Sequence, residues 1–286
     1  MDAGASNHSN LPKHNLKGRF PFRLGTTSYI IPDDIIPNLH YLANQVDDVE
    51  LVLFESDEFS NIPHPADVDT MHRLATSYGL TYTVHLPLDI RLGSADEGER
   101  QASIGKCLRV MERMSQLDPF GWILHLHGDQ RGETPSDNLP VWLSQNRRSL
   151  EEIIHVTGST RSICVETLDY DFDLVAALIE DLDLAVCLDI GHLIVMKRSV
   201  SGHLDRWLDR TRVIHLHGVR ETKDHVDLSH LSPVMLDQII GRLSRPSQIN
   251  RVLTLEIFGE SDFTNSMEIL EKRFTYTIPP MSIRQP

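Results

Sequence analysis

Residues 186–193 read VCLDIGHL and place an aspartate and a histidine three positions apart, directly after an apolar run typical of a buried strand. Asp189 and His192 are both side chains that bind divalent metals, but a single pair of this kind is not diagnostic. Its meaning depends on whether the other apolar runs of the chain end in residues of the same chemistry.

Acidic and histidine residues do follow most of the other apolar runs. Alternate residues of a strand share a face, so each run can be divided into two faces. In residues 162–166, for example, Ile163 and Val165 form an aliphatic face, whereas Glu166 ends the other face. The residues that end such polar faces, or lie in the segment directly beyond, are His85, His125, His127, Glu166, Asp189, His192, His215, His217, Asp224, His225, Asp227 and Glu256.

This set contains no lysine or arginine that could neutralise its carboxylates. Several carboxylates in one apolar-walled cavity are unfavourable unless cations compensate them. Mixed histidine, aspartate and glutamate ligation suits zinc, manganese, iron or cobalt, so the sequence predicts a divalent metal centre of unspecified identity. One isolated histidine is more often an ordinary core or surface residue, which is our interpretation of His203 and His230.

The metal hypothesis requires that the ends of many strands meet. Eight β-like runs alternate with helical segments, which predicts an α/β protein with a single (β/α)8 TIM barrel at residues 21–286. The polar residues 1–20 are predicted to form a disordered tail. A doubly wound open sheet is the alternative, but the chain lacks its glycine-rich phosphate loop. The eight runs are residues 22–29, 49–56, 81–87, 122–128, 162–168, 184–190, 212–218 and 252–258.

The composition limits the partners of this barrel. The formal net charge is −14, from 27 Lys+Arg against 41 Asp+Glu, and no basic run is present, which argues against a nucleic-acid partner. No apolar run reaches membrane length. The three cysteines, Cys107, Cys164 and Cys187, imply no disulfide framework, and we expect buried thiols in a cytoplasmic protein. The sequence does not specify an oligomeric state.

Several motifs resemble those of the xylose-isomerase-like barrel superfamily, which includes sugar-phosphate isomerases, epimerases and endonuclease IV. CLDIGH resembles its sixth-strand motif, VETLD and LTLEIF resemble its metal-binding glutamates, and VHLPLDIRLGS resembles the third-strand segment of endonuclease IV. The resemblance covers most of the chain from the first strand onward. It implies that the metal ligands are His85, His127, Glu166, Asp189, His192, His215, Asp224, His225 and Glu256.

The choice within three pairs of candidates stays open. His125 shares a face with His127, and His215 shares a face with His217. The spacing of Asp224 and His225 departs from the Asp-x-His form of the family, which leaves Asp227 as an alternative to Asp224.

Residues 23–56 resemble the opening of the cobamide-remodelling phosphodiesterases, a branch of this superfamily that also carries LHLHG strands. The resemblance implies hydrolysis of the nucleotide loop of a cobamide, such as cobalamin or pseudocobalamin, to a cobinamide-type corrinoid. A metal cluster that binds a phosphate oxygen and activates water suits this reaction. The catalytic residues would be Glu166, Glu256 and His85, and the neutral corrinoid amides would need no basic patch.

Other functions fit the same residues. A sugar or sugar-phosphate isomerase or epimerase would usually need one metal and an acid/base pair, such as two glutamates on facing strands. An endonuclease IV-like phosphodiesterase would act on nucleic acid, against which the charge argues. A non-catalytic corrinoid- or metal-binding protein would not require so many residues of ligand type.

Overall fold

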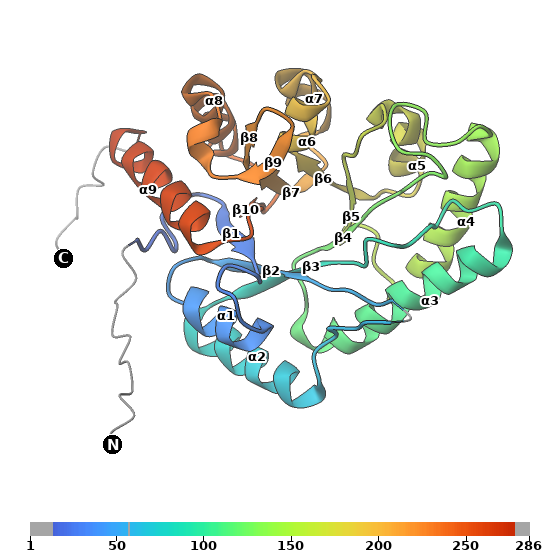
Figure 1. Cartoon of the computed structure of the whole chain (residues 1–286), viewed down its shortest axis with the longest axis horizontal. Helices are drawn as coiled ribbons and strands as arrows, with labels where there is room; N and C mark the ends of the chain where they lie inside the picture. The colour runs from blue at the N-terminus through green and yellow to red at the C-terminus, as the bar shows by residue number, and fades with distance from the viewer. Residues whose placement is uncertain (1–13, 57, 278–286) are drawn as a thin grey trace.

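The computed structural model describes residues 14–56 and 58–277. Eight parallel strands close into a barrel in the order β1-β10-β7-β6-β5-β4-β3-β2, and helices surround it (Figure 1). The predicted (β/α)8 barrel is therefore confirmed. The barrel strands are β1 (Arg23–Thr27), β2 (Asp48–Val52), β3 (Thr81–His85), β4 (Trp122–Leu124), β5 (Ile163–Glu166), β6 (Ala185–Asp189), β7 (Thr211–Leu216) and β10 (Val252–Leu255).

Each barrel strand overlaps one of the eight predicted runs and is shorter than that run. The last residues of most runs leave the sheet and enter the loops at the C-terminal ends of the strands. Strand β4 is the shortest and ends at Leu124, so His125 and His127 lie beyond the regular ladder.

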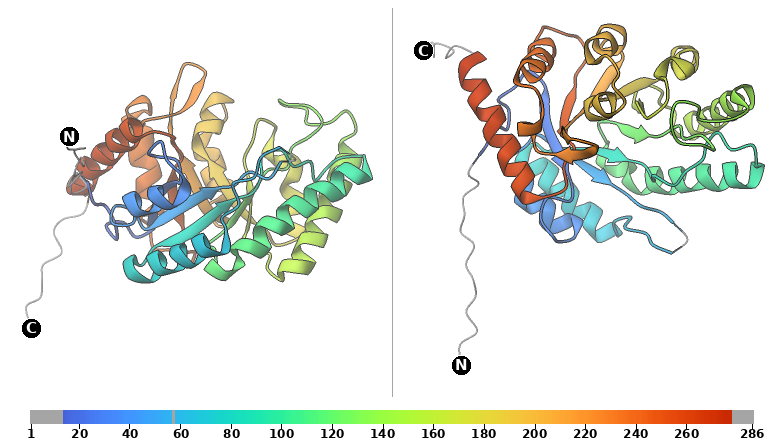
Figure 2. Two further views of the ribbon diagram at one scale, coloured as in Figure 1. Left: turned by 60° about the horizontal axis from the view of Figure 1, so that its bottom comes forward. Right: turned by 45° about the horizontal axis from the view of Figure 1, so that its top comes forward.

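Helices cover the outside of the barrel (Figures 1 and 2). The left-handed residues Gly79 and Gly158 end α2 and α4. The α-helices are α1 (Ile35–Leu42), α2 (Pro65–Tyr78), α3 (Glu97–Met114), α4 (Leu139–Thr157), α5 (Ala176–Asp181), α6 (Ile190–Val195), α7 (Val200–Trp207), α8 (Pro233–Leu243) and α9 (Glu260–Thr277). Short 3-10 helices are η1 (Ser115–Leu117), η2 (Phe172–Val175) and η3 (Leu228–His230).

Two further elements directly follow barrel strands. Helix α6 follows β6 without a loop because the Asp189 carboxylate caps it, accepting a hydrogen bond of 2.6 Å from the backbone N–H of His192. The segment after β7 forms an antiparallel hairpin of β8 (Gly218–Arg220) and β9 (Lys223–Val226). The hairpin projects from the barrel in Figure 2.

The apolar residues form two separate layers. The larger layer lies between the aliphatic faces of the strands and the surrounding helices. A small inner layer fills the barrel and consists of Ile123, Cys164, Ala185, Cys187 and Val213. Cys107, Cys164 and Cys187 are all free and buried, which confirms the prediction of buried thiols. The inner layer closes the barrel below the polar strand ends.

The predicted boundary between tail and barrel, at residue 20, lies inside the described part of the chain. Residues 1–13 of the predicted tail lie outside it. Leu16 is buried, and Nζ of Lys17 donates to the carbonyl oxygen of Val46 over 2.6 Å, so residues 14–20 pack against the barrel.

Over the described ranges, no helix combines the length and the apolar character that crossing a membrane requires.

Candidate metal centre

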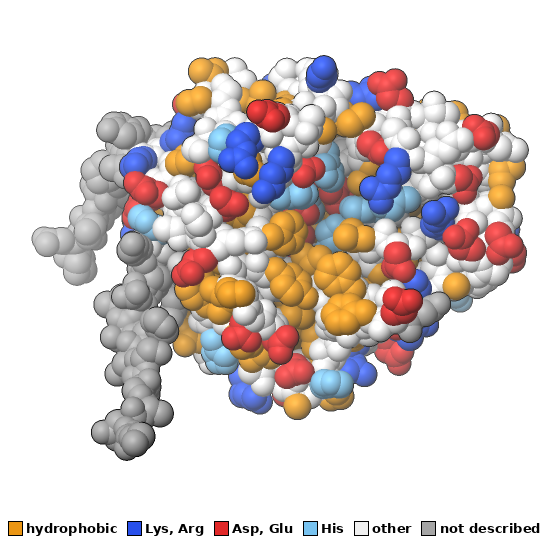
Figure 3. Space-filling model, viewed as in Figure 1, with side chains coloured by type: hydrophobic (Ala, Val, Ile, Leu, Met, Phe, Trp, Pro, Cys, Tyr) orange, Lys and Arg blue, Asp and Glu red, His pale blue; other side chains and the backbone are white. Residues whose placement is uncertain are grey.

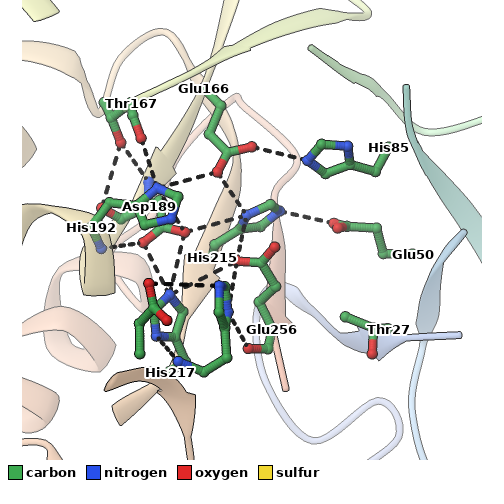
Figure 4. Close-up of polar contacts among 12 residues, drawn as sticks. Thr27, Glu50, His85, Glu166, Thr167, Asp189, His192, His215, His217 and Glu256 are labelled. Carbon is green, nitrogen blue, oxygen red and sulfur yellow. Dashed lines mark hydrogen bonds and ion pairs between the residues drawn. The ribbon is translucent and has the colours of Figure 1, made fainter. Parts of the chain in front are cut away.

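The strand ends place histidines and carboxylates together in the mouth of the barrel. Figure 4 shows these side chains converging from β3, β5, β6, β7 and β10. Figure 3 shows histidine and acidic side chains in a hollow of this face, with hydrophobic side chains beside it. The described residues form four groups of metal-ligating atoms. Three of them consist of histidines and carboxylates alone, and two carboxylates link these three groups.

The central group consists of Glu166, Asp189, His215 and Glu256, whose ligand atoms lie within 4.8 Å of one another. Nδ1 of His215 lies 3.1 Å from Oε2 of Glu256 and 3.5 Å from Oε1 of Glu166. These three atoms are buried and have no hydrogen-bond partner among the described residues. Buried polar atoms are normally satisfied, so three unsatisfied atoms that face one another fit a bound cation.

A second group shares Glu166 with the central one. Nε2 of His125 lies 2.9 Å from Oε2 of Glu166, and Nε2 of His85 lies 3.2 Å from the same oxygen. Because Oε1 faces His215 and Oε2 faces these two histidines, Glu166 can bridge two metal positions.

The third group consists of His192, His217 and His225, from α6, the end of β7 and β9. Nε2 of His217 lies 3.2 Å from Oδ1 of Asp189, so Asp189 links this group to the central one. The glycine of the DIGH motif makes this packing possible, because a Cβ atom at Gly191 would collide with the His217 ring.

The open pairs of candidates differ in their relation to the groups. His125 belongs to the second group, whereas the predicted ligand His127 belongs to none, and its Nε2 lies 3.0 Å from Nδ1 of His125. His127 therefore lies beside the groups and not within them. His215 and His217 both belong to groups, because both side chains lie inside the barrel.

The acidic residues of the hairpin segment do not join these groups. Asp224 is half-buried, and its Oδ2 lies 3.9 Å from Nε2 of His225, so the predicted ligand Asp224 lies beside the third group and not within it. The alternative, Asp227, caps η3 by accepting from the backbone N–H of Ser229 over 2.8 Å. That capping role explains its position.

Glu50 on β2 was not predicted. Its Oε2 lies 2.9 Å from Nε2 of His215, and both side chains are fully buried. The available signal was the two acidic residues, Asp48 and Glu50, that alternate with Val and Leu in the buried segment DVELV, where burial of an unpaired carboxylate would be unfavourable. Cys187 also lies beside Glu166 and His215, but burial raises the pKa of its thiol well above the usual range, which disfavours a thiolate ligand.

The electrostatics keep the two linking carboxylates ionised. Burial alone would raise the pKa of Glu166, but the His125 and His215 rings hold it well below its usual value. Burial would likewise raise the pKa of Asp189, but the His192 and His217 rings hold it well below its usual value. Burial opposes the charged form of His192, yet Asp189 and Glu166 raise its pKa to about 9. The centre therefore favours positive charge, as protons or as bound metal ions.

A pocket of about 390 Å³ opens above the groups. Ligand-type histidines form part of its wall. Its apolar wall consists of Leu88, Leu168, Val195 and Met196, and its remaining lining includes His127, Arg131, Asp169 and Asp224. The pocket gives a small molecule access to the metal-ligating atoms.

A family model described as xylose isomerase-like TIM barrel matches residues 43–273. No curated protein sequence matches the chain significantly. Among solved structures, a D-tagatose 3-epimerase-like protein is similar, with a TM-score of 0.69, 18% identity, and coverage of 89% of this chain and 97% of that one.

Two further structures show the same fold. For 3-keto-D-glucoside 4-epimerase from E. coli, the TM-score is 0.67 at 15% identity, with 89% and 99% of the two chains covered. For endonuclease IV from Thermus thermophilus, the TM-score is 0.61 at 19% identity, with 87% and 99% covered.

Proposed function

The chain belongs to the xylose isomerase-like TIM barrel family, and from this premise we propose that it is a metal-dependent phosphodiesterase. Its substrate would be a cobamide, hydrolysed at the nucleotide loop to a cobinamide-type corrinoid. The observation that carries the phosphodiesterase proposal is the pair of oxygens of Glu166, one directed to the central group and the other to His85 and His125.

A shared carboxylate supports adjacent metal ions, and adjacent metal ions suit displacement at phosphorus more than isomerisation of a sugar. The ligands would be Glu166, Asp189, His215 and Glu256 for the central position, His85, His125 and Glu166 for the second, and His192, His217 and His225 for the third. Bound divalent metals would supply Lewis acidity to a phosphoryl group and activate water as a nucleophile at neutral pH.

The protein groups orient this chemistry. Nδ1 of His85 donates to the carbonyl oxygen of Leu86 over 2.9 Å, which leaves Nε2 directed at Glu166. The backbone carbonyl of Glu256 lies 3.0 Å from Nδ1 of His225 and fixes that ring. The Glu256 side chain is 9% exposed against 1% for Glu166, so Glu256 is better placed to orient water entering from the pocket.

The corrinoid substrate rests on the resemblance of residues 23–56 to cobamide-remodelling phosphodiesterases and on charge. With a net charge of −14, the protein repels a polyanionic nucleic acid more than a corrinoid with neutral amide side chains. For this reason we propose the cobamide reaction before an endonuclease IV-like activity.

The direct test is incubation of the metal-loaded protein with adenosylcobalamin, followed by mass spectrometry. We expect a cobinamide-type corrinoid and the released nucleotide portion. Absence of this product with zinc, manganese, iron and cobalt alike would refute the cobamide proposal.

A sugar epimerase is the second candidate, and the two glutamates of the central group support it. Glu166 and Glu256 lie on β5 and β10 and could act as an acid/base pair around a single metal ion. Elemental analysis separates the two candidates, because the phosphodiesterase requires more than one metal ion per chain at full activity, whereas the epimerase requires one. Isomerisation of a ketohexose by the single-metal protein would support the epimerase.

A further inference from the structure

The pocket above the metal-ligating groups contains a cationic side chain that the proposed mechanism does not use. Arg131 is the lone lysine or arginine in the pocket lining formed by the described residues. It is exposed, and within residues 14–56 and 58–277 its guanidinium makes no ion pair or hydrogen bond. Most other arginines of this acidic protein are paired with carboxylates, as Arg147 is with Asp181.

The loop that carries Arg131 is held in place on both sides of the residue. The backbone N–H of Gly132 donates to the Asp169 carboxylate, and that of Gln130 donates to the carbonyl oxygen of Pro135 over 3.0 Å. At the start of the loop, a Cβ atom at Gly128 would collide with the backbone of Pro135. These contacts position the Arg131 backbone at the rim of the pocket.

His127 lies next to Arg131 and is available for binding. The His127 and Arg131 side chains both belong to the pocket lining. Its Nε2 lies 3.0 Å from Nδ1 of His125. When Nε2 of His125 binds a metal, Nδ1 of His125 carries the proton and donates to Nε2 of His127. The proton of His127 then resides on its Nδ1, which has no partner among the described residues.

A guanidinium presents a planar set of donors that matches the oxygens of phosphate. A neutral sugar would leave this charge unpaired beside the bound metal ions. The apolar part of the pocket lining, formed by Leu88, Leu168, Val195 and Met196, suits an apolar surface. The required ligand therefore combines an anionic group with an adjoining apolar group.

We propose that Arg131 and His127 form an anion subsite that binds the phosphate of a phosphate ester, while the apolar part of the substrate contacts Leu88, Leu168, Val195 and Met196. This inference rests on the proposed phosphodiesterase and names its substrate class. Arg131 then selects phosphate esters over the neutral sugars on which an epimerase acts.

The test measures binding without turnover. Methyl phenylphosphonate is a monoanionic phosphodiester analogue with an apolar ring, and dimethyl phenylphosphonate is its neutral counterpart. Product analysis after each titration checks that neither ester has been cleaved. Isothermal titration of the metal-loaded full chain should show that Arg131→Gln weakens binding of the anion by about tenfold or more, the scale of one charge-assisted hydrogen bond. Arg131→Lys should weaken it less, because it keeps the charge and loses the planar donor set.

Three controls accompany the titration. Arg147→Gln removes an arginine on α4 outside the pocket lining and should bind the anion as the wild type does. Elemental analysis should give equal metal content for all variants. Any binding of the neutral ester should be unchanged by Arg131→Gln.

The outcomes separate this inference from the proposed function. Equal affinity of wild type and Arg131→Gln for the anion, or no binding by the metal-loaded wild type, overturns the subsite. Arg131-dependent binding of the phosphonate together with failure to cleave adenosylcobalamin supports the subsite and overturns the cobamide as substrate.

Discussion

Nε2 of His215 lies 2.9 Å from Oε2 of Glu50, and neither side chain is exposed to solvent. Oε2 of Glu50 accepts a hydrogen bond from the Nε2–H group of His215. The lone pair of Nδ1 of His215 is then directed at Glu166 and Glu256. Carboxylates in this position orient metal-ligating histidines and increase their basicity. Glu50 is therefore a positioning residue for His215.

Substitution of Glu50 should weaken metal binding without removing a ligand. We expect Glu50→Ala to lower metal affinity about 10–100-fold, the range typical of such outer partners, and Glu50→Gln to lower it less, because the amide oxygen still accepts from Nε2. Competition with a chromophoric chelator measures the affinity, and circular dichroism checks the fold. Wild-type affinity in both folded variants would show that Glu50 has no positioning role.

Two carboxylates of the central group, Glu166 and Glu256, should be essential for turnover. Glu166→Gln and Glu256→Gln each replace one carboxylate of the central group, and we expect each to lower the rate by more than about 100-fold, as loss of one strong electrostatic partner does. Glu180→Gln, which alters an exposed ion pair with Arg206, is the control and should retain activity. Full activity of both central variants at equal metal content would contradict the assignment.

The sequence predicted the strand-end ligands because side chains alternate along a regular strand. Glu166 and Asp189 end β5 and β6, where this rule still holds. The rule fails for His125 and His127, because β4 ends at Leu124 and the backbone beyond it is irregular. Glu50 was missed because it lies within a strand and not at its end.

The hairpin after β7 could not be predicted for a different reason. Glu221 and His225 adopt positive φ angles of 60° and 53°, which side-chain-bearing residues seldom do, and the sequence contains no glycine at either position. The close contact of Gly191 with His217 could not be predicted either, because it joins residues from different elements.

That contact gives a specific test of the third group. Gly191→Ala should push the His217 ring away from Asp189, so the variant should lose one metal ion per chain and about 1–3 kcal/mol of unfolding free energy from overpacking. Gly241→Ala on α8 is the matched control, since its added methyl group meets no atom within 4 Å. The control should keep its metal and gain about 0.5–1 kcal/mol from helix propensity. Unchanged metal content in Gly191→Ala would argue against His217 as a ligand.

Asp48, near the other end of the barrel, should make stability depend on pH. Burial raises its pKa from 3.8 to about 6, so the folded state holds the proton more tightly than the unfolded state. The free energy of unfolding should therefore fall as pH rises from about 4 to about 6, by up to about 3 kcal/mol. Asp48→Asn should remove this loss, because its amide can donate to Oγ1 of Thr83, which has no partner among the described residues.

Urea unfolding of wild type and Asp48→Asn at pH 4 to pH 7 measures the effect. The variant should be the more stable protein at pH 7, and its advantage should vanish near pH 4, where the aspartate is protonated in the folded state. A constant difference across this range would show that Asp48 is not the titrating group.

Removal of the metal ions should abolish activity and lower the melting temperature while leaving the barrel folded. Without cations, the buried carboxylates of the central group repel one another. A site filled at 1,000 times its dissociation constant stabilises the folded state by about 4 kcal/mol, which is lost on chelation. The inner apolar layer and the outer core contain no predicted ligand, so far-UV circular dichroism should be retained.

Activity and melting temperature should be measured on the same chelated sample and again after addition of zinc, manganese or cobalt. Full activity in protein shown to be metal-free by elemental analysis would rule out the metal mechanism and favour acid/base catalysis by Glu166 and Glu256 alone.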